Sequence, residues 1–199
     1  MKATQSLPQN YQPAGKFSLK SIKQLVIMNI FGLILLIISI WFFPWFTKQV
    51  RPDFNTLFQF EFDNLLDLAV ALIKIILPII FVLLIHEAIH AFFFWFFSKQ
   101  KPVVGFKGAY AYAAMPGWYF PRNQYLIIGI SPLLLITLFG MLLLLVAPTS
   151  MIDLVLIALI INTSGAIGDL FVVIWLLTKP TTTYALDEID TIEFFVPNS

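Results

Sequence analysis

The two histidines of this chain, His86 and His90, stand four residues apart, and Glu87 follows the first of them directly. In a helix, positions i and i+4 share one face, so both imidazoles can hold one metal ion while the neighbouring glutamate reaches its water. The pattern HEAIH therefore predicts a zinc hydrolase site, with His86 and His90 as metal ligands and Glu87 as the general base.

A third protein ligand is expected, because a catalytic zinc ion usually takes three and leaves a fourth position open. The chain has no cysteine and no other histidine, so a carboxylate must supply it. Most carboxylates belong to expected loops or to the polar C-terminal segment: Asp53, Glu61, Asp63, Asp67, Asp153, Asp187, Glu188, Asp190 and Glu193. Asp169 alone lies deep inside an apolar segment, where a charge needs a partner. We therefore expect Asp169 to complete the metal site.

The elements that must position these residues are expected to be membrane helices. The composition is 59% hydrophobic and the mean hydropathy is +0.88, too apolar for a soluble domain of 199 residues. Apolar runs long enough to cross a bilayer cover residues 25–46, 68–97, 124–147 and 152–177. The second run is overlong, so we place Lys74 at an interface, limit the span to 75–97, and expect Pro78 to kink or loosen its first turns.

The expected fold is an all-α membrane protein with four transmembrane helices. The helical domain covers residues 25–178, between polar tails at 1–24 and 179–199. A small β-like hairpin is expected at Val103 to Ala113, between the second and third helices, where two glycines interrupt short β-like runs. The acidic stretch from Asp187 to Glu193 is expected to be a solvated face of the C-terminal tail.

Charge indicates the orientation of the helices. Lysine and arginine cluster in the N-terminal tail and between the second and third spans, at Lys2, Lys16, Lys20, Lys23, Lys99, Lys101, Lys107 and Arg122. By the positive-inside rule, both regions and both termini are expected to be cytoplasmic. A formal charge of +1 provides no basic field for a nucleic acid, so polynucleotide partners are not expected.

Depth along the helices supports a shared site. Asp169 precedes Thr178 by nine residues, or about 13 Å, while His90 and His86 lie about 10 and 17 Å before Phe97. The three groups can therefore meet at one level. The alternative is a satisfied polar cluster that only packs the second helix against the fourth. Asn162, two turns before Asp169, is expected either to orient the substrate backbone or to hydrogen-bond between helices.

A family resemblance rests on these residues together with several segments. HEAIH is followed by a glycine-rich stretch, by PRNQYLIIGISPLLL, by NTSGAIGD in the fourth span and by the tail YALDEIDTIEFFV. Over about residues 20–196 the chain resembles a bacterial family of small four-helix membrane proteins, the putative zincin peptidases, and is similar to site-2-type intramembrane metalloproteases. The resemblance implies zinc ligation by His86, His90 and Asp169, Glu87 as general base, and Asn162 near bound substrate.

The expected function is therefore zinc-dependent hydrolysis of peptide bonds within or near the plasma membrane of a bacterium. The expected partners are membrane lipids and a membrane-protein or peptide substrate, which the β-like hairpin could hold as an added strand. An alternative is a catalytically inactive zinc-binding protein that acts as a scaffold or partner-binding module. A metal or ion transporter is the weakest candidate, because a single polar site offers no path across the helices.

Overall fold

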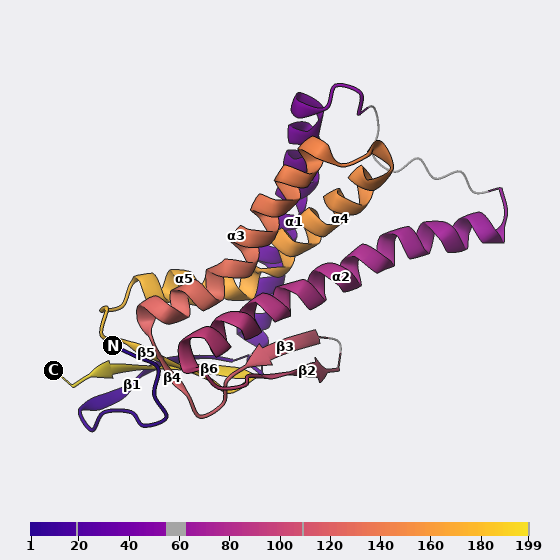
Figure 1. Cartoon of the computed structure of the whole chain (residues 1–199). Helices are drawn as coiled ribbons and strands as arrows, with labels where there is room; N and C mark the ends of the chain where they lie inside the picture. The colour runs from indigo at the N-terminus through magenta and orange to yellow at the C-terminus, as the bar shows by residue number, and fades with distance from the viewer. Residues whose placement is uncertain (19, 55–62, 109, 199) are drawn as a thin grey trace.

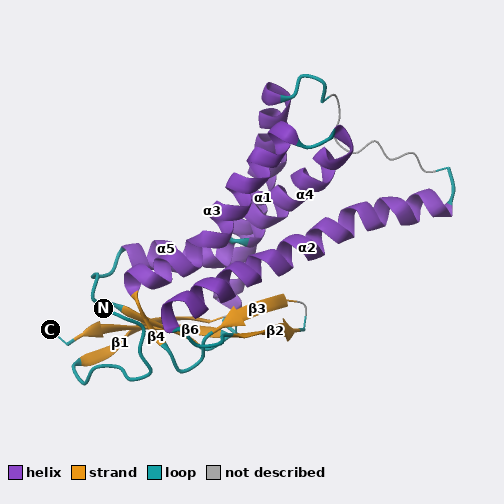
Figure 2. Cartoon of the chain, viewed as in Figure 1, coloured by secondary structure: helices purple, strands orange, loops and turns teal. Residues whose placement is uncertain are grey.

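The computed structural model describes residues 1–18, 20–54, 63–108 and 110–198, so Glu61 and Ala109 lie outside the described residues. The helices are α1 (Ile22–Val50), α2 (Leu65–Ser98), α3 (Arg122–Val146), α4 (Thr149–Gly165) and α5 (Ile167–Leu177). The strands are β1 (Tyr11–Ser18), β2 (Val103–Lys107), β3 (Tyr110–Ala114), β4 (Tyr119–Pro121), β5 (Tyr184–Asp187) and β6 (Thr191–Pro197). The helices extend from one end of the molecule, and the strands gather at that end (Figure 2).

The helices have the length and composition of a membrane protein. In the described part of the chain, α1, α2 and α3 are each long and apolar enough to cross a bilayer. Helix α2 runs unbroken through Lys74 and Pro78, so it extends beyond the expected membrane span of residues 75–97, and the limits of that span stay a prediction. It begins after Asn64, whose side-chain oxygen caps the first turn by accepting from the backbone amides of Leu66 and Asp67.

The fourth expected helix is broken. Helices α4 and α5 meet at Ala166 and are bent by 45°, and only together do they make a fourth candidate span. The expectation of one continuous helix over residues 152–177 is therefore wrong. Glycines flank the bend at Gly165 and Gly168, and glycine is the least favourable residue for a helix interior after proline. Because of the bend, Asn162 and Asp169 belong to different helices and do not share one helical face.

The terminal segments, which were expected to be polar tails, contain strands that pair with each other. Strand β1 pairs antiparallel with β6, from Tyr11 opposite Pro197 to Ser18 opposite Thr191. The sheet order is β1-β6-β5-β4, and the two chain ends lie close together (Figure 1). Aromatic and β-branched residues in Thr191–Pro197 favour a strand. Because its partner lies more than 170 residues earlier, no local sequence pattern indicates the pairing.

The expected hairpin between the second and third helices is confirmed as the antiparallel pair β2–β3, which forms a separate two-stranded sheet. Strands were therefore expected at one place, whereas the described residues contain two sheets. The position of the β2–β3 hairpin on the cytoplasmic side stays a prediction.

Two of the three hydrophobic clusters formed by the described residues lie on either side of the site. One joins the sheet end of the helices to the strands and includes Phe94, Tyr125, Leu176 and Phe194. The other lies around Leu144, Ile152, Leu156 and Leu159, where α3 and α4 meet α1. Along α4 and α5, the polar residues of the predicted site fall between these two cores, so packed side chains on both sides hold the site in place.

Candidate metal centre

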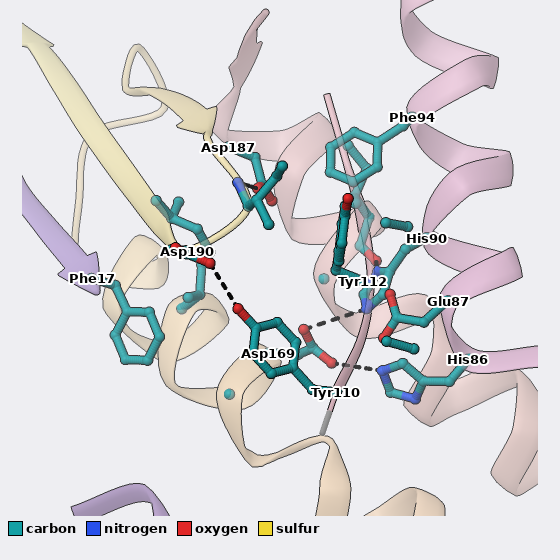
Figure 3. Close-up of a pocket in the computed structure, with 18 of the residues that line it drawn as sticks. Phe17, His86, Glu87, His90, Phe94, Tyr110, Tyr112, Asp169, Asp187 and Asp190 are labelled. Carbon is teal, nitrogen blue, oxygen red and sulfur yellow. Dashed lines mark hydrogen bonds and ion pairs between the residues drawn. The ribbon is translucent and has the colours of Figure 1, made fainter. Parts of the chain in front are cut away.

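The three predicted ligands converge. His86 and His90 project from α2 and Asp169 from the first turn of α5, and one potential ligand atom from each lies within 4.8 Å of the others. His86 Nε2 is 3.0 Å from Asp169 Oδ2, and His90 Nε2 is 3.4 Å from Asp169 Oδ1 (Figure 3). Within the described residues, this is the one group of three or more such side chains close enough to hold a metal ion.

Local structure explains the convergence. The i, i+4 spacing brings the two imidazole rings together edge to face on one side of α2, with centroids 4.9 Å apart and an interplanar angle of 72°. The bend at the fully buried Ala166 redirects the chain, so that Asp169 stands in the N-terminal turn of a new helix. The positive end of the helix dipole favours a carboxylate at that position.

A backbone carbonyl orients His90. The Nδ1 atom of His90 lies 2.9 Å from the carbonyl oxygen of Ile128 in α3. A carbonyl oxygen only accepts, so this contact places the proton on Nδ1 and leaves the lone pair on Nε2. The carbonyl is free because the residue four positions later is Pro132, which has no backbone N–H to complete the helical hydrogen bond.

A side-chain amide orients His86 in the same way. The Nδ1 atom of His86 donates to Asn162 Oδ1 over 3.0 Å, and Asn162 is buried with an exposed fraction of 3%. The expected alternative of a hydrogen bond between helices is therefore what the structure contains. Asn162 is not among the residues that line the cavity beside the site. Its role in substrate binding stays a prediction.

The resulting arrangement fits a cation. Both Nε2 lone pairs face the Asp169 carboxylate, an arrangement of acceptors only, which a metal ion between them would stabilise. Two donor atoms on a tetrahedral zinc ion, each at about 2.0–2.2 Å, lie about 3.3 Å apart. The separations of 3.0 Å to Oδ2 and 3.4 Å to Oδ1 of Asp169 are close to that spacing, and one ligand atom from each of the three residues lies within 4.8 Å of the others. The nitrogen and oxygen donors are also those that zinc accepts.

A cavity of about 240 Å³ opens beside the three ligands, and Glu87 lines it. The Glu87 carboxyl also lies beside the backbone amide of Ala113 in β3. Most of the cavity wall comes from α2, α3, α5, β3 and the region around the β5–β6 turn, and single residues of β1, α1 and α4 complete it. The site thus has three candidate ligands, one free carboxyl group and room for water and part of a substrate.

Two acidic residues of the C-terminal segment also line this cavity. Asp187 and Asp190 are buried, with exposed fractions of 8% and 9%, so the expectation that this stretch is a solvated face is wrong for both. Asp187 accepts from the Tyr125 hydroxyl over 2.7 Å and from the amide of Ile189 over 3.1 Å. Burial raises the pKa of Asp187 to about 6.

Asp190 connects the two sheets across the cavity. It accepts from the Tyr110 hydroxyl over 2.7 Å and from the Lys107 ammonium group, and Lys20 lies 3.6 Å away. These contacts, with the Lys107 hydrogen bond first, lower the pKa of Asp190 to about 2. The alternating apolar residues of Thr191–Pro197 were the one sequence signal that this segment folds back onto the protein.

Comparison with known proteins places the chain in a family. A family model described as "Putative zincin peptidase" matches residues 79–184, more than half of the chain. The chain belongs to this family. The matched region contains His86, Glu87, His90, Asn162 and Asp169, so the whole centre lies within it. Neither the curated proteins nor the solved structures include a significant match.

Membership in the zincin peptidase family indicates a metallopeptidase, and it implies zinc as the metal. The His86, His90 and Asp169 group could bind that ion. The apolar helices of the chain further indicate a membrane protein.

Proposed function

We propose that this protein is a zinc-dependent peptidase that hydrolyses peptide bonds within the membrane or at its surface, with zinc held by His86, His90 and Asp169. The observation that carries the proposal is the fixed orientation of both imidazoles. Asn162 and the Ile128 carbonyl occupy the two Nδ1 atoms, so both Nε2 atoms face the Asp169 carboxylate. Such outer hydrogen bonds are typical of histidines that bind a metal.

Glu87 is the proposed general base. A zinc ion in this site would supply Lewis acidity, which lowers the pKa of water towards about 7 and polarises a scissile carbonyl. Glu87 lies in the helical position next to His86 and lines the same cavity, so its carboxylate can take a proton from the attacking water. The same carboxyl can then deliver that proton to the amine of the leaving peptide.

Strand β3 is the proposed substrate platform. Among the described residues it pairs only with β2, and Tyr110 to Ala113 line the cavity beside Glu87. An extended segment of substrate can add to the other edge of β3 through backbone hydrogen bonds, which fixes the peptide without demanding particular side chains. A helical substrate would have to unwind first, because a helix keeps its backbone groups paired internally.

The proposed setting is a bacterial plasma membrane, with four crossings and both termini in the cytoplasm. The pairing of β1 with β6 supports an even number of crossings, since it requires both terminal segments on one side. The bent pair α4–α5 would then be the fourth crossing. The proposed partners are lipids and a membrane-protein or peptide substrate.

Two variants test the proposal. In purified protein, Asp169→Ala should lose bound zinc, whereas Glu193→Gln, a matched change of a carboxylate that does not line the cavity, should keep it. Glu87→Gln should keep zinc and lose hydrolysis, so that it traps substrates. Normal zinc content in Asp169→Ala would refute the ligand assignment. Unchanged hydrolysis by Glu87→Gln would refute the peptidase mechanism and leave the zinc-binding scaffold as the better description.

A further inference from the structure

Two separate sheets meet over the metal centre. The hairpin β2–β3 and the sheet β1-β6-β5-β4 share no backbone pairing among the described residues. Both nevertheless line the cavity, through Tyr110 to Ala113 of β3 and through Asp187, Ile189, Asp190, Thr191 and Ile192 around the β5–β6 turn. The space above the metal centre is therefore bounded by a seam between two sheets.

Side chains close this seam, and Asp190 makes most of the contacts. One carboxylate binds the Tyr110 hydroxyl and the Lys107 ammonium group from the hairpin, and Lys20 approaches from the segment after β1. The Asp190 side chain is only 12% exposed, whereas Lys107 and Lys20 are 55% and 77% exposed. Because the lysine ends of these ion pairs are exposed, water can compete for the ammonium groups, which weakens the pairs. Figure 3 shows the Asp190–Tyr110 bond in the same cavity as the metal ligands.

The cavity is too small for the proposed substrate. Its volume is about 240 Å³, below the roughly 300–1,000 Å³ of pockets that hold drug-sized ligands. An extended segment of four residues is about 13 Å long. A peptide laid along β3 would therefore meet the β5–β6 turn, and the seam has to widen before the peptide can reach Glu87.

The β5–β6 turn contains one residue in an unfavourable backbone conformation. Ile189, which lines the cavity, has a φ of 68°. A β-branched residue rarely adopts this left-handed conformation, which persists only when surrounding contacts enforce it and is common in switch segments. The contacts here are the Asp187 side chain on the Ile189 amide and the Asp190 carboxylate on the hairpin. Backbone hydrogen bonds from the Glu188 amide to Thr191 and from the Asp190 amide to Glu188 also shape the turn. Release of Asp190 removes the contacts that tie the turn to the hairpin.

We propose that Asp190, through its contacts with Tyr110 and Lys107, is a latch that holds the β5–β6 turn over the metal centre, and that substrate enters between the two sheets when the latch opens. The chain thereby inhibits itself until it meets a substrate. The inference rests on the proposed peptidase function for its purpose. The opening itself can be measured without hydrolysis or metal.

The first test measures access to the cavity. The chain has no cysteine, so Ala111→Cys introduces a single thiol into the cavity wall. In this background, Asp190→Asn should raise the rate of maleimide labelling severalfold, and Glu193→Gln should leave it unchanged. Lys107→Met opens the latch from the other side and should act like Asp190→Asn. Equal labelling rates in all four proteins would overturn the latch.

The second test locks the latch. In the double variant Asp190→Cys with Lys107→Cys, a short bifunctional thiosulfonate reagent joins the two thiols. A reductant then breaks this cross-link. A control pair, Lys16→Cys with Glu193→Cys, joins opposed residues of β1 and β6 away from the seam. Cross-linking should stop peptide hydrolysis and slow zinc release to a chelator at least about tenfold in the first pair alone, and reduction should restore both.

The two tests separate failure of the latch from failure of the proposed function. If hydrolysis and zinc release are the same before and after cross-linking across the seam, the latch is refuted even though the peptidase proposal stands. If the protein holds no zinc and cleaves nothing, the proposed function fails, and the labelling rates at Ala111→Cys still decide whether Asp190 controls access.

Discussion

Replacement of Asn162 by leucine tests the argument that a fixed imidazole orientation defines the metal centre. Leucine has a similar shape but cannot accept the hydrogen bond from His86 Nδ1. Because Asn162 is 97% buried, water cannot easily take its place. His86 is then left with an unpaired N–H, or it moves the proton to Nε2 and loses the lone pair that faces Asp169.

Two separate estimates give a similar loss of zinc-binding free energy. An unsatisfied buried donor costs about 1–3 kcal/mol. Removal of an outer hydrogen bond to a metal-binding histidine lowers metal affinity about 10–100-fold, which is about 1.4–2.8 kcal/mol. We therefore expect Asn162→Leu to weaken zinc binding by one to two orders of magnitude while the fold persists.

Competition with a chromophoric chelator, on protein in lipid nanodiscs, measures this affinity. Thr163→Val is the matched control, because the buried Thr163 hydroxyl has no hydrogen-bond partner among the described residues. Asn162→Asp keeps an acceptor for His86 and should recover at least the wild-type affinity. A folded Asn162→Leu protein that binds zinc as tightly as Thr163→Val would show that the imidazole orientation does not depend on this contact.

Three further changes test other parts of the structure. Pro132→Ala restores an amide that competes for the Ile128 carbonyl, so zinc affinity in the same assay should fall severalfold, and an unchanged affinity would contradict the role of the proline. Gly140→Ala should cost about 1–3 kcal/mol in thermal unfolding, because its Cβ would lie 2.5 Å from Leu159 Cδ2, whereas Gly165→Ala has no atom within 4 Å of its Cβ and should stay within about 1 kcal/mol of the wild type; equal losses would argue against this packing. For Asp187, the folded pKa of about 6 exceeds the unfolded value of about 4, so its contribution to stability is lost as pH rises through about 6. The free energy of unfolding of Asp187→Asn, relative to that of the wild type, should therefore rise by up to about 3 kcal/mol as the pH increases from 4 to 7. A difference that does not change with pH would refute the raised pKa.

The metal ligands could be predicted because few residues were available. Two histidines at helical spacing and one aspartate in an apolar segment leave little choice once cysteine is absent. The structure brings His86, His90 and Asp169 together as that reasoning required. Ligation by zinc itself stays a prediction.

The hydrogen bonds behind the ligands were harder to predict. Pro132 predicts a carbonyl at Ile128 that lacks its helical hydrogen bond. Which side chain donates to that carbonyl depends on how α2 packs against α3. Asn162 was placed by helical periodicity on the face of Asp169, and the bend at Ala166 removes that relation. Periodicity describes a continuous helix, so it fails where the backbone changes direction.

The sheet over the cavity could not be predicted from local sequence patterns. Hydropathy separates membrane helices from polar segments, but it carries no information on whether two polar segments pair with each other. Strands β1 and β6 meet only through the fold of all five helices between them. Asp187 and Asp190 were consequently expected in solvent, and their burial follows from that pairing.

The place of β6 between β1 and β5 also orders events during biosynthesis. Tyr11–Ser18 is translated before any of the helices, yet its partner Thr191–Pro197 is translated after all of them. Until then β1 has no partner, and Phe17 and the β5–β6 turn cannot enclose the cavity that they line in the folded protein. A chain still on the ribosome can thus insert its helices and bring its ligands together without an enclosed site. The cover over the cavity is therefore completed last, after the final strand has been translated.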